Sequence, residues 1–328
     1  MSSTSVGQVN VAEVDGLEII SLIDNSVDFL STIDRKDIQS FREWTKKRYG
    51  EEWAGTHSEL PIAEHGFSVL IRILFGKKSV SVLFDTGISA EGVVENAKRM
   101  GLELSQVEYI VLSHGHYDHF GGLLSALKAI NKPNLPLILH EDMVKTRGAT
   151  SSDGKIRLYE KFPDVQSLNP AKIINTKQPT LFADDMVLVT GEIERVTSFE
   201  TGFTKQKVLV DGAWHPDPFV WDDRAIVFNV KNEGLVVVSG CAHAGIINTI
   251  RYAKKITQIQ NVYGIIGGFH LAGKENEGKI EQTVRELKQI NPRRVIPSHC
   301  TGWRAIFAIA KAFPDAFVWG SVGNKYVF

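Results

Sequence analysis

Four residues that can bind metal ions lie within six consecutive positions, in the segment H-G-H-Y-D-H. They are His114, His116, Asp118 and His119. Imidazole nitrogens and carboxylate oxygens are common protein ligands of zinc and related divalent ions. Because alternate residues of an extended loop point to the same side, His114 and His116 can reach one ion together. Asp118 and His119 follow a bend and can reach a second ion. Two ions about 3.5–4 Å apart can hold a hydroxide and bind a substrate oxygen.

The surroundings of this segment favour a functional role over a chance cluster of surface histidines. The apolar run Ile110–Leu112 precedes it and predicts a buried strand, and two glycines and a helix starting near Leu123 follow it. Packing gives no reason to place four potential metal ligands directly after a buried strand. The segment 109–122 therefore predicts a strand, a metal-binding loop and a helix at the end of a sheet.

The H-x-H-x-D-H segment resembles the signature of the metallo-β-lactamase fold superfamily. The resemblance spans nearly the whole chain, which we expect to form a single domain over residues 1–328. It implies an α/β (α+β) fold, the four-layer αββα sandwich, with a metal site at one edge of the two sheets. It also implies that Asp85, at the end of the strand 79–84, orients the metal loop by hydrogen bonding and does not itself bind metal.

Three later apolar runs also end in ligand types. Residues 235–239 precede Cys241 and His243, residues 262–266 precede His270, and residues 294–297 precede His299. The segments S-G-C-A-H-A-G-I, G-G-F-H-L and P-S-H-C-T-G resemble one branch of the superfamily. That branch contains the dihydropterin (β-ribofuranosylaminobenzene) phosphate synthases and related metal-dependent hydrolases.

The resemblance implies the following division of the ligands between two ions. His114, His116 and His243 would hold one ion, whereas Asp118, His119 and His299 would hold the other. Asp118 would also orient the nucleophile and is a candidate catalytic residue.

Cys241 stands where superfamily members often carry a bridging aspartate. It is either a thiolate ligand or a small buried residue near the site. His270 is a pocket residue, either a ligand or a group that contacts substrate phosphate or protonates a leaving group.

The stretch 145–223 is rich in glycine, proline, aspartate and lysine, and only short parts of it, near 186–190 and 193–196, look like strands. Such an insertion in a compact domain is typical of a lid or a substrate-binding loop. His215 lies in an expected loop, 214–219, and could line the pocket.

For other polar residues near strand ends, we expect a structural role and not metal binding. We expect His65 to be a core or edge histidine, Asp24 and Asn25 to form a turn, and His140 to stand at a strand-to-helix junction.

The composition and charge of the chain limit the classes of partner that we expect it to bind. The chain has 328 residues, 43% hydrophobic and 23% charged, with a net charge of −1. The near-neutral charge gives no electrostatic case for nucleic acid, and no apolar run is long enough to span a membrane. Two cysteines and a polar start without a signal-like segment lead us to expect a reducing, cytoplasmic setting. The sequence says nothing of the oligomeric state.

We therefore expect a metal-dependent hydrolase that activates water at two divalent ions, Zn²⁺ or alternatively Mn²⁺ or Fe²⁺. The substrate would be a small molecule such as a phosphoester, ester or lactone. Two alternatives stay open: a ribofuranosylaminobenzene phosphate synthase, which is a transferase, and a non-catalytic metal or ligand sensor. A di-iron redox enzyme is a further rival, although no flavin-binding G-x-G-x-x-G segment accompanies it.

Overall fold

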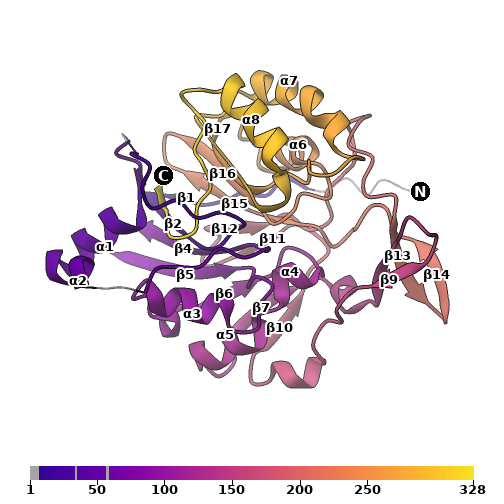
Figure 1. Cartoon of the computed structure of the whole chain (residues 1–328), viewed down its shortest axis with the longest axis horizontal. Helices are drawn as coiled ribbons and strands as arrows, with labels where there is room; N and C mark the ends of the chain where they lie inside the picture. Colours follow the sequence, from indigo (N-terminus) through magenta and orange to yellow (C-terminus); the bar gives the residue numbers. More distant parts are fainter. Residues whose placement is uncertain (1–6, 34, 57–58) are drawn as a thin grey trace.

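The computed structural model describes residues 7–33, 35–56 and 59–328. Two sheets pack face to face and helices cover both outer faces, as Figure 1 shows. The expected αββα sandwich is confirmed.

The first sheet has eight strands in the order β10-β7-β6-β5-β4-β2-β19-β3. The neighbours β4 and β5 are antiparallel, whereas β5, β6 and β7 are parallel. The strands are β2 (Gly16–Ile23), β3 (Ile38–Gln39), β4 (Ser68–Phe75), β5 (Lys78–Phe84), β6 (Tyr109–Val111), β7 (Pro136–Leu139), β10 (Lys172–Asn175) and β19 (Lys325–Val327).

The second sheet has the order β11-β12-β15-β16-β17-β18, and β1 pairs with β15 beside this path. Its last three strands, β16, β17 and β18, run parallel. The strands are β1 (Glu13–Val14), β11 (Thr180–Phe182), β12 (Val187–Val189), β15 (Ala225–Val230), β16 (Gly234–Ser239), β17 (Val262–Gly268) and β18 (Arg294–Ser298).

The central strands of each sheet are buried on both faces and are largely apolar, as in β15 and β16. On β2, Leu17 and Ile19 face the core between the sheets, and Ile20 and Leu22 face the outer helices. This division follows from the two-residue period of a strand. The core between the sheets is completed from the second sheet by residues such as Phe228.

The helices form the two outer layers. The first sheet is covered by α1 (Phe41–Tyr49), α3 (Gly92–Arg99) and α5 (Leu123–Ile130), and the second by α6 (Ile246–Thr257), α7 (Ile280–Ile290) and α8 (Trp303–Ala312). The short helices α2 (Glu51–Thr56) and α4 (Tyr117–Phe120) complete the set. In the described part of the chain, no helix is long and apolar enough to cross a membrane.

The insertion 145–223 is more regular than its sequence predicted. A third sheet, in the order β14-β13-β8-β9, is formed by β8 (Arg147–Thr150), β9 (Ile156–Leu158), β13 (Gln206–Val210) and β14 (Ala213–Pro216). Three further strands of the insertion, β10, β11 and β12, extend the two main sheets. The strand expected near 186–190 is present, but the one near 193–196 is absent and 213–216 is a strand, not a loop. The hairpin of β13 and β14 turns at Asp211 and Gly212, and this Asp-Gly pair was the available local signal.

Candidate metal centre

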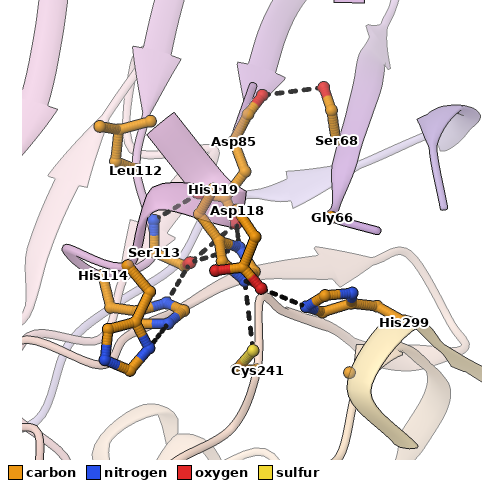
Figure 2. A network of polar contacts seen from close by, with 12 residues as sticks. Gly66, Ser68, Asp85, Leu112, Ser113, His114, Asp118, His119, Cys241 and His299 are labelled. Atoms are coloured by element: carbon orange, nitrogen blue, oxygen red, sulfur yellow. Dashed lines mark hydrogen bonds and ion pairs between the residues drawn. The ribbon is translucent and has the colours of Figure 1, made fainter. Parts of the chain in front are cut away.

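Parallel strands bring the candidate ligands together, because their carboxyl ends lie at one edge of a sheet. In the first sheet, β5 and β6 end at Asp85 and at the His114–His119 loop. In the second sheet, β16, β17 and β18 lead into Cys241, His270 and His299. Figure 2 shows side chains from both sheets pointing toward one another at this edge.

The three ligands predicted for one ion converge through their ring nitrogens. Nε2 of His114 lies 2.9 Å from Nδ1 of His116 and 3.1 Å from Nε2 of His243. The opposite nitrogens of the first two rings are engaged elsewhere: Ser113 Oγ lies 2.9 Å from Nδ1 of His114, and Gln206 Oε1 lies 2.9 Å from Nε2 of His116. The inner nitrogens thus face a common point, as one ion requires.

The ligands predicted for the other ion form a second group. Nε2 of His119 and Nε2 of His299 lie 3.9 Å and 3.2 Å from Oδ2 of Asp118. Sγ of Cys241 lies 3.2 Å from Nε2 of His119. The ligand atoms of all four residues lie within 4.8 Å of one another.

Cys241 belongs to both groups. Its sulfur also lies within 4.8 Å of ligand atoms of His114 and His243. Of the two roles that the sequence left open, this position supports a ligand, placed between the two groups where a bridging residue would stand.

Asp85 makes the hydrogen bonds that its predicted role requires. Its Oδ2 atom lies 2.6 Å from Nδ1 of His119, and its two oxygens accept hydrogen bonds from the backbone N–H and the hydroxyl of Ser113, both at 2.7 Å. The backbone of Asp85 has a φ of 59°, a left-handed conformation that aspartate tolerates better than most residues. Asp85 therefore holds His119 with Nε2 turned toward Cys241.

Asp24 and Asn25 do more than form a turn, and here the sequence-based interpretation was incomplete. Asp24 Oδ1 accepts a hydrogen bond from the backbone N–H of His299 at 2.8 Å, and Asn25 Oδ1 lies 2.9 Å from Nδ1 of His299. These contacts anchor His299, which has a φ of 46°. Two polar residues directly after an apolar strand were the available signal.

His65 was expected to be structural, but it lies at the rim of the site. Its Nε2 atom is 3.3 Å from Oδ2 of Asp118, and its side chain is 56% exposed. Its ring centroid is 4.8 Å from that of His299. By contrast, His140 is a buried structural residue as expected, because its Nδ1 accepts a hydrogen bond from the backbone N–H of Asp142.

His270 lies beside the first ligand group. Its ring centroid is 4.2 Å from that of His243, and one of its nitrogens lies within 4.8 Å of the sulfurs of Cys241 and Cys300. His215 belongs to neither ligand group among the described residues. It is exposed on β14, in the third sheet.

The insertion supplies three residues that sequence reasoning missed. Gln206 contacts His116, as described above. Asp222 accepts a hydrogen bond from the backbone N–H of Gly115, between the first two histidines, at 2.8 Å. Arg147 binds Asp222 through both terminal nitrogens and holds its carboxylate in place. These residues are buried and distant in sequence, so no local pattern marks them.

The first group is poised to donate lone pairs. Burial, aided by the neighbouring histidines, holds the pKa of His114 well below its usual value. Burial likewise lowers the pKa of His116 to about 4 and that of His243 well below the usual value. These rings are therefore neutral at pH 7, which is the form that binds metal.

The second group contains complementary charges. Burial tends to raise the pKa of Asp118, but the charge of His119 and hydrogen bonds from His299 and His65 outweigh it and hold that pKa well below its usual value. Burial tends to lower the pKa of His119, but Asp85 and Asp118 raise it to about 9. An ion bound at Nε2 of His119 must therefore displace a proton.

The donor set fits divalent metal ions. It combines imidazoles, one carboxylate and one thiol, all buried or nearly so. Hydrogen bonds on the outer nitrogens fix ring orientation, as is usual for histidines that bind metal.

A four-layer αββα sandwich with an H-x-H-x-D-H loop at the sheet edge defines the metallo-β-lactamase class of fold. The family model described as "Metallo-beta-lactamase superfamily" matches residues 62–254. The chain belongs to this superfamily.

Its relatives include two proteins of Methanocaldococcus jannaschii. One is named 7,8-dihydropterin-6-methyl-4-(beta-D-ribofuranosyl)-aminobenzene-5'-phosphate synthase and is 30% identical over 278 residues, which is 81% of this chain and 90% of that protein. The other, the uncharacterized protein MJ0448, is 31% identical over 266 residues, or 80% of this chain and 93% of that protein.

The crystal structure of Tm1679, described as a metal-dependent hydrolase of the beta-lactamase superfamily, has the same fold. Its TM-score is 0.70 at 24% identity, covering 94% of this chain and 98% of that one.

Proposed function

We propose that this protein is a hydrolase that uses two divalent metal ions, with zinc as the first expectation, to activate water on a small molecule. The substrate would be a phosphoester, an ester or a lactone. The observation that carries the proposal is the shared position of Cys241 between the two ligand groups, because one residue within 4.8 Å of ligand atoms in both brings two ions close together. Bound ions of this kind supply a nucleophile at neutral pH and stabilise charge on a substrate oxygen.

Side chains around the two ligand groups can orient the nucleophile, carry protons and contact the substrate. Asp118, ionised and accepting hydrogen bonds from His65 and His299, can orient the nucleophile. The hydrogen bond that His65 donates to the Asp118 carboxylate raises the pKa of His65, so this half-exposed ring can carry a proton at the rim of the site. His270, next to His243, can contact a phosphate or a leaving group.

A synthase is the second candidate, and the 30% identity to the M. jannaschii synthase favours it. In that reaction the same residues would position a phosphorylated sugar and stabilise charge during a condensation. The buried histidines and carboxylate suit either reaction, so only substrates separate the two.

The test is elemental analysis of protein purified without added metal, followed by assays with bis(p-nitrophenyl) phosphate, p-nitrophenyl esters and lactones. We expect close to two ions per chain and hydrolysis of one substrate class. His116→Ala should lose both metal and activity. His215 is an exposed histidine outside both groups, so His215→Ala should keep its metal.

Two ions with no hydrolysis, but with condensation of a pterin with a ribosylated aminobenzene phosphate, would establish the synthase. Metal without turnover of either kind would favour a sensor, and two irons with a charge-transfer band would favour redox chemistry.

A further inference from the structure

The two cysteines of this chain, Cys241 and Cys300, lie together although they are 59 positions apart in the sequence. Their sulfur atoms are within 4.8 Å of each other, and Sγ of Cys300 lies 3.6 Å from the backbone oxygen of Cys241. Both are free thiols. Cys241 belongs to both metal-ligand groups. Cys300 belongs to neither, but its sulfur forms a third cluster with Cys241 and His270, whose possible ligand atoms lie within 4.8 Å of one another. The pair therefore joins the two ligand groups to a second thiol.

A glycine between them makes this approach geometrically possible. Cys241 follows β16 and Cys300 follows β18, and β17 runs between these two strands. Gly268 is the last residue of β17. A Cβ atom at Gly268 would lie 2.6 Å from Sγ of Cys300 and 3.2 Å from Cα of Cys241, too close for any side chain. The bare backbone there leaves room for a sulfur to cross from one loop to the other.

The two thiols differ in access to solvent. Cys241 is buried, at 3% exposure, whereas Cys300 is partly exposed on the turn His299–Thr301. A small oxidant from solvent therefore meets Cys300 first, with Cys241 behind it as the resolving thiol.

We propose that Cys241 and Cys300 are a modification site at which a peroxide forms a reversible disulfide that withdraws Cys241 from the metal centre. The sulfur of Cys300 attacks hydrogen peroxide, the O–O bond breaks, and a sulfenic acid and one water form. The sulfur of Cys241 then displaces the hydroxyl, which leaves as a second water. Two thiols lose two electrons and two protons, and one peroxide becomes two waters. An S–S bond of about 2.05 Å needs side-chain rotation from the present separation.

The consequence for the metal follows from ligand chemistry, because a disulfide sulfur is no longer a thiolate donor. This part of the inference rests on the proposed two-metal function. The disulfide itself does not, because it depends only on the position of the two sulfurs.

The test treats purified, metal-loaded protein with hydrogen peroxide, blocks free thiols with iodoacetamide and digests with trypsin. Cleavage after lysine and arginine places the two cysteines in peptides 232–251 and 295–304. We expect a mass equal to both peptides minus two hydrogens, with release of metal in step with it, measured by a chromophoric chelator. Dithiothreitol and added metal should reverse both changes.

Cys300→Ser is the matched control, because it removes the partner thiol and leaves both ligand groups intact. We expect it to retain metal under peroxide at least several times longer than the unmodified protein. Separate blocked peptides without the linked mass would overturn the proposal, as would a linked mass with no loss of metal. Failure of the proposed function would look different: reduced, metal-loaded protein would hydrolyse none of the model substrates, whatever the peptides show.

Discussion

The side chain of Gln206 should control how tightly the first ligand group binds its ion. Its Oε1 atom lies 2.9 Å from Nε2 of His116, and the residue is fully buried. Because Oε1 only accepts, it keeps the proton on Nε2 and leaves the Nδ1 lone pair facing Nε2 of His114, 2.9 Å away. Gln206→Leu retains a side chain of similar size and removes the acceptor.

The expected loss of metal affinity can be estimated from the general effect of removing a hydrogen-bond partner of a metal-binding histidine. Loss of the hydrogen-bond partner behind a histidine ligand weakens metal binding by about 10–100-fold, or about 1.4–2.7 kcal/mol. Only one ion should be affected, because the outer nitrogens of the second group are held by Asp85 and Asn25. Gln206→Glu keeps an acceptor at the same position and should bind metal at least as tightly as the original.

A competition titration against a chromophoric chelator measures both affinities, and thermal unfolding measured in parallel shows that each variant is folded. A folded Gln206→Leu protein with two unchanged affinities would refute the reasoning. Equal losses in Gln206→Leu and Gln206→Glu would show that the shape of the side chain matters, and not its acceptor.

Four further outcomes are expected. Asp85→Asn, which tolerates the left-handed backbone, should weaken the ion at His119 by about 10–100-fold in the same titration, with a smaller loss at the other ion, which Asp85 supports through Ser113. Arg147→Met should lower the free energy of unfolding by about 3–5 kcal/mol in urea, because it leaves the buried carboxylate of Asp222 unpaired; a loss below 1 kcal/mol would contradict this. The pair also sets a pH dependence. Burial tends to raise the pKa of Asp222, but Arg147 outweighs it and holds the folded-state pKa below the ordinary value of 3.8. The stabilisation by Asp222 is therefore complete well above pH 3.8 and is lost as the pH falls through the folded-state pKa. In Arg147→Met the still-buried carboxyl should have a raised pKa, so its contribution to stability should instead fall as the pH rises, which urea unfolding at several pH values will show. Finally, chelation of bound metal should lower the unfolding midpoint, since an ion at 100 times its Kd stabilises the fold by about 2.7 kcal/mol; an unchanged midpoint after verified metal removal would mean that the ions do not bind the folded state preferentially.

Local sequence predicted most of the strands of the two main sheets outside the insertion, and it marked most of the candidate ligands. The apolar runs on β5, β6, β16, β17 and β18 predict buried strands, and each is followed at once by a chemically distinct residue. Ligands at fixed spacing on one loop, such as His114 and His116, can be recognised because their relative positions depend on a few backbone dihedrals. The αββα fold follows from the same signature by resemblance.

Tertiary structure alone decided which residues support those ligands. Gln206 lies 90 positions from His116, and Asn25 lies 274 positions from His299, yet each pair is in hydrogen-bond contact. His65 and Asp118 are likewise far apart in the sequence and in contact in the folded structure. A side chain at such a distance is positioned by strand pairing and core packing over the whole molecule. The residues next to it in the sequence do not indicate which partner it will contact. The contact forms only when the two sheets pack against each other.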